Sequence, residues 1–67
     1  MSVAKVTEII VESEKSFEDA VVQGVKRANK TLDQVKAAWV KEQKAVIENG
    51  DVVGFRVVLK VTFLLKD

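Results

Sequence analysis

The stretch VVGFRVVLKVTFLL, residues 52–65, decides the fold. Every second side chain in it is apolar, which gives a row of seven: Val53, Phe55, Val57, Leu59, Val61, Phe63 and Leu65. Because side chains of a β-strand alternate between two faces, these seven share one face. The row predicts a long strand that forms the floor of the core, while the opposite face, with Arg56 and Lys60, is mixed.

Two further strands are expected, at residues 3–12 and 35–48. The first reads VAKVTEIIVE and is rich in β-branched residues, which favour strands. The second ends at Asn49-Gly50, a pair typical of two-residue hairpins because both central residues need positive φ. With that turn, paired residues have numbers that add to 99, unless a bulge shifts the register. The expected pairs include Ala37–Thr62, Ala38–Val61, Trp39–Lys60, Val40–Leu59, Lys41–Val58, Gln43–Arg56, Val46–Val53 and Ile47–Val52.

Between the first two strands, the apolar spacing changes to that of a helix. From Phe17 to Leu32, apolar residues recur three or four positions apart. Ser16 is expected to cap the helix, and acidic residues follow in the first turn, where the helix dipole favours them. Gly24 lies on the apolar stripe and predicts a close approach between helix and sheet.

The expected fold class is therefore α+β, a β-α-β-β chain in which one helix packs on a three-stranded antiparallel sheet. Residues 1–67 are expected to form a single domain. Strands of about 12–14 residues span roughly 40 Å, too far for one helix to cover. We therefore expect the chain to cover its remaining apolar surface by assembling into a homo-oligomer.

Composition narrows the functional classes. The chain has 67 residues, a net charge of +1, and neither Cys nor His. Disulfides, thiolate metal sites and the commonest general base are absent, so we expect no catalytic residues and no enzyme activity. The balanced charge predicts no nucleic-acid or membrane partner. Without a membrane-spanning or signal-like segment, a cytoplasmic location is expected.

The sheet face away from the helix carries the candidate site, with Ala37, Trp39, Lys41, Gln43, Arg56 and Lys60. A Trp beside cations and an amide can stack on a flat heteroaromatic ligand and hydrogen-bond it. Trp and Arg are also enriched at subunit interfaces, and on composition alone this face is more typical of a contact between copies than of a ligand site. Lys60 over Trp39 is also consistent with a simple cation–π pair.

The segments VTEII, SFEDAV, KRANKTLDQVKAAWV and FRVVLKVTFLL resemble the dodecin family over nearly the whole chain. The resemblance implies hollow shells of twelve identical subunits that bind flavins in pairs at subunit contacts. Flavin-binding members stack a Trp on the flavin ring, at the position of Ala37 here, whereas the Trp of this chain lies at Trp39. They also use a Gln at the position of Arg56, where a donor-only guanidinium now stands.

The candidate cofactor-binding residues are accordingly Ala37, Trp39, Gln43 and Arg56, and the implied ligand is riboflavin, FMN or FAD. The stretches WVKEQ and FRV are more similar to a dodecin subgroup that lacks the flavin-stacking Trp, for which calcium binding is proposed; no metal ligands are assigned here. The main hypothesis is a non-enzymatic homo-oligomer that binds or stores a small molecule. The alternative is a flavin-free shell with a structural or calcium-binding role.

Overall fold

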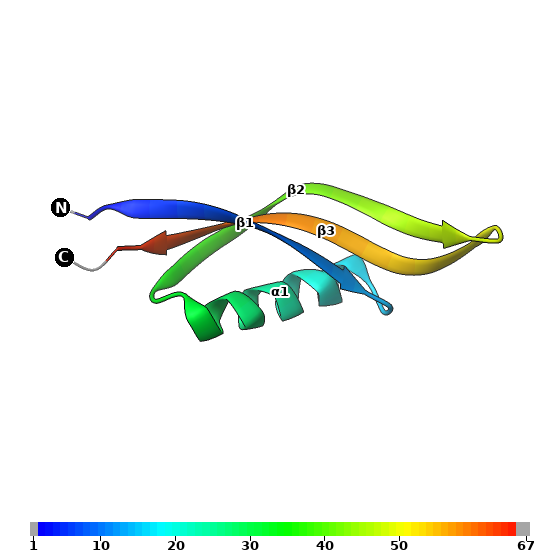
Figure 1. Ribbon diagram of the computed structural model, residues 1–67, viewed down its shortest axis with the longest axis horizontal. Coiled ribbons are helices and arrows are strands. Elements are labelled where there is room, and N and C mark those ends of the chain that lie inside the picture. Colours follow the sequence, from blue (N-terminus) through cyan, green and yellow to red (C-terminus); the bar gives the residue numbers. More distant parts are fainter. Residues whose placement is uncertain (1, 66–67) are drawn as a thin grey trace.

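The computed structural model describes residues 2–65 and has four elements. They are β1 (Ala4–Ser13), α1 (Phe17–Thr31), β2 (Val35–Glu48) and β3 (Asp51–Leu64). The three strands form one antiparallel sheet in the order β1-β3-β2, so the apolar strand β3 lies in the centre. Helix α1 lies against one face of the sheet (Figure 1). The α+β fold expected from the sequence is confirmed.

The ends of the elements follow local chemistry. The Ser16 hydroxyl caps α1 by accepting a hydrogen bond from the Asp19 amide at 2.9 Å, as the sequence predicts. Asn49 and Gly50 have φ values of 51° and 82°, which are the positive angles that the tight β2–β3 turn requires. Gln34 has φ 52° at the connection into β2, which no sequence pattern predicted.

The predicted hairpin register is right at both ends and wrong in the middle. Five expected pairs are confirmed: Ala37–Thr62, Ala38–Val61, Trp39–Lys60, Val40–Leu59 and Ile47–Val52. Register shifts at Val40/Glu42 and Val46/Ile47 displace the pairs between them by one residue. The observed partners there are Glu42–Val58, Gln43–Val57, Lys44–Arg56 and Val46–Gly54, in place of Lys41–Val58, Gln43–Arg56 and Val46–Val53. An irregularity at Lys41 is the cause, because one additional residue moves the following side chains to the other face.

The core is small and lies under the middle of α1. Its buried apolar members are Ala20, Ala28, Val57, Leu59 and Val61. The ends of the predicted apolar row are not buried, since Val53 is 42% exposed and Leu65 is 44% exposed. A helix rises less per residue than a strand, so α1 is shorter in space than β3. It therefore covers only the centre of the row.

Gly24 explains how α1 comes so close to the sheet. A Cβ atom at this position would lie 2.6 Å from Val11 Cγ2 and 2.9 Å from Leu59 Cδ1. The predicted close approach is therefore confirmed. Near the start of the helix, the rings of Phe17 and Phe55 meet edge to face with centroids 5.1 Å apart.

The chain is elongated. It measures 51 × 19 × 14 Å, and its radius of gyration is 13.7 Å, against about 11 Å for a compact domain of this length. The β2–β3 hairpin extends past the end of β1 and past α1 (Figure 1). None of the helices among residues 2–65 is long and apolar enough to cross a membrane.

Candidate functional site

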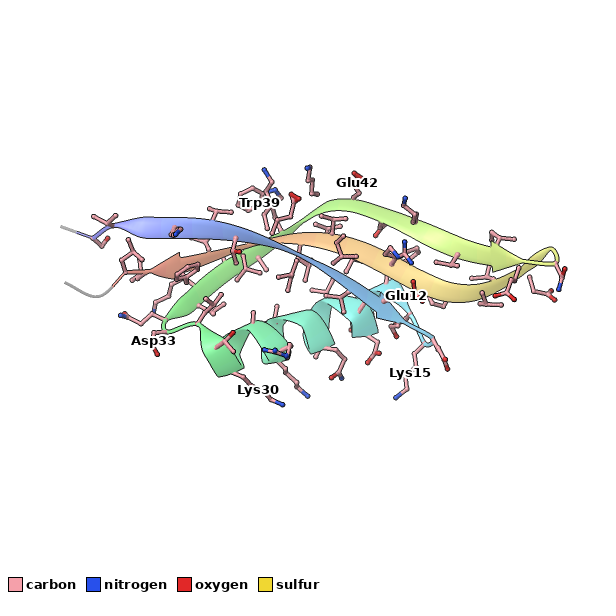
Figure 2. The ribbon with its side chains drawn as sticks, in the orientation of Figure 1. Glu12, Lys15, Lys30, Asp33, Trp39 and Glu42 are labelled. Carbon is pink, nitrogen blue, oxygen red and sulfur yellow. The ribbon has the colours of Figure 1, made fainter. Side chains whose placement is uncertain are left out.

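The outer face, defined here as the sheet face turned away from α1, carries an exposed aromatic ring. Trp39 is 48% exposed, and it points away from the helix (Figure 2). The Lys60 Nζ atom lies 5.6 Å from the centroid of the Trp39 ring, within cation–π range. An exposed indole beside an ammonium group can stack on a flat, electron-rich or anionic partner.

Two ion pairs lie on the same face and join strands. Lys41 Nζ lies 3.2 Å from Glu8 Oε1, which links β2 to β1 across β3. The Arg56 guanidinium donates through Nε and Nη2 to Glu12 Oε1, at 3.0 and 2.8 Å. All four side chains are nearly half exposed, so each pair contributes only about 0–1 kcal/mol to stability. The main effect of the two ion pairs is to hold these charged side chains in place on the outer face. Their effect on the stability of the fold is small.

The structure brings together some of the candidate residues and separates others. Ala37, Trp39 and Arg56 all lie on the outer face, because their partners Thr62, Lys60 and Lys44 follow one alternation of the sheet. Gln43 pairs with Val57, which is buried beneath α1, and therefore lies on the helix side.

Arg56 is distant from the exposed indole. It is four residues along β3 from Lys60, the partner of Trp39, which places it about 13 Å away along the strand. A single ring stacked on Trp39 within one chain is therefore far from the Arg56 guanidinium.

The turn between β1 and α1 is organised by a residue that sequence reasoning did not single out. Ser13 is buried, its hydroxyl donates to Asp19 Oδ2 at 2.6 Å, and it accepts from the Lys15 amide at 2.9 Å. The hydrogen bond from Ser13 lowers the pKa of Asp19, and smaller contributions come from Gln23, Lys15 and Lys26. Only the clustering of Ser13, Ser16 and Asp19 in the sequence marks this arrangement.

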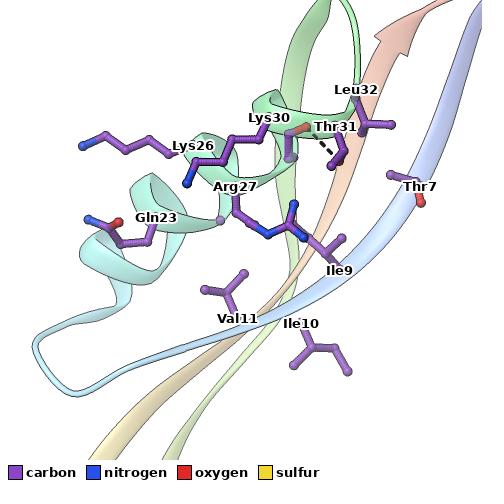
Figure 3. A pocket seen from close by; sticks show the side chains of 12 residues that line it. Thr7, Ile9, Ile10, Val11, Gln23, Lys26, Arg27, Lys30, Thr31 and Leu32 are labelled. Carbon is purple, nitrogen blue, oxygen red and sulfur yellow. Dashed lines mark hydrogen bonds between the residues drawn. The ribbon is translucent and has the colours of Figure 1, made fainter.

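A groove between α1 and β1 was also not anticipated. It has a volume of about 790 Å³, and apolar residues of β1 and basic residues of α1 line it (Figure 3). The late basic residues of the helix have a simpler explanation in the sequence, as complements of the helix dipole. Their place beside an open groove depends on how the helix is set on the sheet, which the spacing alone does not show.

The acidic side chains of residues 2–65 bear on whether one chain can hold a metal ion. Among residues 2–65, no three or more acidic side chains come together in a way that would hold a metal ion. The two acidic residues of β1 on the outer face, Glu8 and Glu12, are each paired with a basic side chain.

Comparisons with known proteins identify the family. The dodecin family model matches residues 3–66. A protein of Mycobacterium tuberculosis named calcium dodecin is 35% identical over 66 residues, covering 98% of this chain and 93% of that protein. Its crystal structure, described as having a novel calcium-binding site, superposes with a TM-score of 0.84 at 34% identity, covering 97% of this chain and 93% of that one.

Two further solved structures are closer in shape. The dodecin from Streptomyces davaonensis has a TM-score of 0.93 at 27% identity, covering 98% of this chain and 97% of that one. A variant of the Thermus thermophilus dodecin has a TM-score of 0.93 at 34% identity, with both chains fully covered.

The finer placement in the subgroup without a flavin-stacking Trp is not supported, because this chain carries Trp39 on its outer face. The β-α-β-β chain with its extended hairpin superposes on the solved dodecins, and the dodecin family model matches residues 3–66. This chain therefore belongs to the dodecin family.

Proposed function

We propose that the protein is a non-enzymatic homo-oligomer whose subunits meet through the outer face and bind a flat heteroaromatic molecule beside Trp39. The family resemblance makes a flavin the first candidate ligand. The observation that carries the proposal is the half-exposed Trp39 ring on a face that also exposes Ile10 (69%) and Val6 (46%). Apolar side chains gathered in this way are typical of a surface that is covered in the assembled protein.

Assembly follows from the thin, extended shape. With five buried apolar residues among residues 2–65 and an uncovered sheet face, a single chain has little core for its length. Contact with further copies supplies the missing cover without disulfides or metals. The family implies a shell of twelve subunits, and we adopt that number as part of the proposal.

In the proposed site, Trp39 stacks on the ligand ring, and Lys60 places a positive charge next to it. Ala37, two residues earlier on the same face, is small and leaves room beside the indole. Arg56 is held by Glu12, so it offers donors of fixed orientation to a ligand bound where copies meet. Gln43 lies on the helix side, and we leave it out of the proposed site.

Fluorescence tests the ligand directly. Trp39 is the one Trp in the sequence, and there is no Tyr, so the intrinsic tryptophan fluorescence comes from this site. Titration with FMN or riboflavin should quench this fluorescence.

Variants of Trp39 test the stacking. Loss of a stacking ring costs about 1–3 kcal/mol, so Trp39→Ala should weaken flavin binding by about 5- to 150-fold. Flavin fluorescence measures the affinity. Trp39→Phe, which keeps a ring, is the matched control and should lose less. Equal affinities for all three proteins would show that Trp39 is not the stacking residue.

Calcium binding is the second candidate function, and the 35% identical calcium dodecin favours it. Among residues 2–65 of one chain, no three or more acidic side chains come together to hold a metal ion. A calcium site would therefore need acidic side chains from more than one copy. Hard cations take several oxygen ligands, and Glu42 on the outer face is a candidate contributor. Titration calorimetry with calcium tests this function, and the absence of heat at millimolar calcium would remove it.

A further inference from the structure

The hairpin tip, defined as residues 47–53, extends into solvent with an unusual pair of charges. Glu48 and Asp51 stand directly opposite each other in the last pair before the turn. Like charges in opposed positions of a sheet destabilise it. Within residues 2–65, neither carboxylate has a basic partner. No basic side chain among the described residues therefore offsets their repulsion.

The tip is also apolar. Its exposed side chains include Ile47 (56%), Val52 (51%) and Val53 (42%). No strand pairs with β3 on the β1 side here, because β1 ends at Ser13, opposite Phe55. The tip thus combines exposed apolar side chains with two acidic groups that have no basic partner among residues 2–65, at the end of a projecting hairpin.

The groove between α1 and β1 has the complementary character. Its apolar lining includes Ile9, Val11 and Leu32, and its basic residues are Lys26, Arg27 and Lys30 on α1. Arg27 reaches from the helix toward β1 (Figure 3). Within the part of the chain that the structure describes, Arg27 and Lys30 form no ion pair. β1 is also an edge strand, since β3 is its sole neighbour in the sheet.

The tip does not reach the groove of its own chain. It extends beyond the end of β1 and away from α1, while the groove lies along these two elements (Figures 1 and 3). We propose that the acidic hairpin tip of one subunit docks in the basic α1–β1 groove of a neighbouring copy. Glu48 and Asp51 then face Arg27 and Lys30, and Ile47, Val52 and Val53 gain apolar cover.

The contact joins two different surfaces of the chain. When each copy gives its tip to one neighbour and receives the tip of another, the contact is heterologous and extends the assembly into a ring or a closed shell. It rests on the proposed assembly, and it deepens that proposal by naming a second contact besides the outer face. Charge complementarity across it selects the partner and the register of the contact.

A charge swap tests the contact in the full-length protein. We expect Glu48→Lys with Asp51→Lys, or Arg27→Glu with Lys30→Glu, to raise the protein concentration needed for assembly by at least about tenfold. Combining all four reversals should restore assembly, which misfolding would not allow. Glu14→Lys, which reverses an acidic group in the turn between β1 and α1, is the control and should assemble as the unchanged protein does. Sedimentation velocity over a dilution series at low salt measures each variant.

Cross-linking gives an independent measurement. A carbodiimide joins carboxylates to amines that lie in direct contact, so it should link Glu48 or Asp51 to Lys30 or Lys26. A mixture of isotopically labelled and unlabelled chains shows by mass spectrometry whether the link joins two copies. Three results would overturn the proposal. The tip variants could assemble normally, or the variant with all four charge reversals could fail to assemble. Cross-links between copies could also lack any link between the tip and the groove. A protein that stays monomeric would instead remove the proposed assembly itself.

Discussion

At the scale of single residues, Gly24 sets the distance between helix and sheet. Alanine is a better helix former by about 1 kcal/mol, yet its Cβ would lie 2.6 Å from Val11 Cγ2. Overpacking a tight core costs about 1–3 kcal/mol, and this cost dominates. We expect Gly24→Ala to lower the free energy of unfolding by about 1–2 kcal/mol in urea titrations at fixed protein concentration. Asn29→Ala, on the exposed side of α1, is the control and should be neutral or slightly stabilising. A Gly24→Ala protein at least as stable as the unchanged chain would contradict the close packing.

Asp19 makes stability depend on pH at the same scale. Its pKa is lowered in the folded chain, first by the Ser13 hydroxyl. The ionised carboxylate therefore stabilises the fold at pH values above the ordinary carboxyl range. This contribution is lost as the pH falls below about 4 and through the lowered pKa.

Ser13→Ala should return the pKa of Asp19 toward its ordinary value, because the largest favourable interaction of the carboxylate is removed. Gln23→Ala is the matched control and should raise it by less. An NMR titration of the Asp19 carboxyl carbon measures both variants. A pKa of Asp19 that is the same with and without the Ser13 hydroxyl would show that another group holds the carboxylate.

At the scale of elements, α1 divides the apolar row of β3 into covered and uncovered parts. Leu59 is fully buried, whereas Phe63 on the same face is only half-buried. We expect Leu59→Ala to cost about 2–5 kcal/mol. Phe63→Ala should cost less, although it removes a larger side chain. Thermal and denaturant unfolding at one protein concentration measures both variants. Equal or reversed costs would mean that Phe63 is as well covered as Leu59 in the protein in solution.

Strong local patterns explain how much of the fold was predictable. The period-two row of β3, the Ser16 cap and the Asn49-Gly50 turn are each determined by neighbouring residues, and the structure reproduces them. The register shift near Lys41 was not predictable. The stretch KEQK, residues 41–44, is polar at both alternations, so no hydrophobic preference decides which face each residue takes.

At the scale of the whole molecule, the candidate site was only partly predictable, because the site we propose draws on more than one copy of the chain. Trp39 and Arg56 were expected on the outer face and lie there, while the same register shift separated Gln43 from them. In the proposed assembly, the α1–β1 groove and the hairpin tip face surfaces of other copies. A sequence pattern records which residues share a face, and it does not record how two copies meet.

The central claim is that copies of this chain assemble and bind a flavin beside Trp39. Sedimentation velocity of the purified protein with excess FMN, followed at both protein and flavin wavelengths, tests it most directly. The account predicts flavin absorbance that moves with a large oligomer, and Trp39→Ala should lose the flavin while keeping the oligomer. A large oligomer without flavin would contradict the ligand and leave calcium or a structural role. A monomer would contradict the assembly on which the account rests.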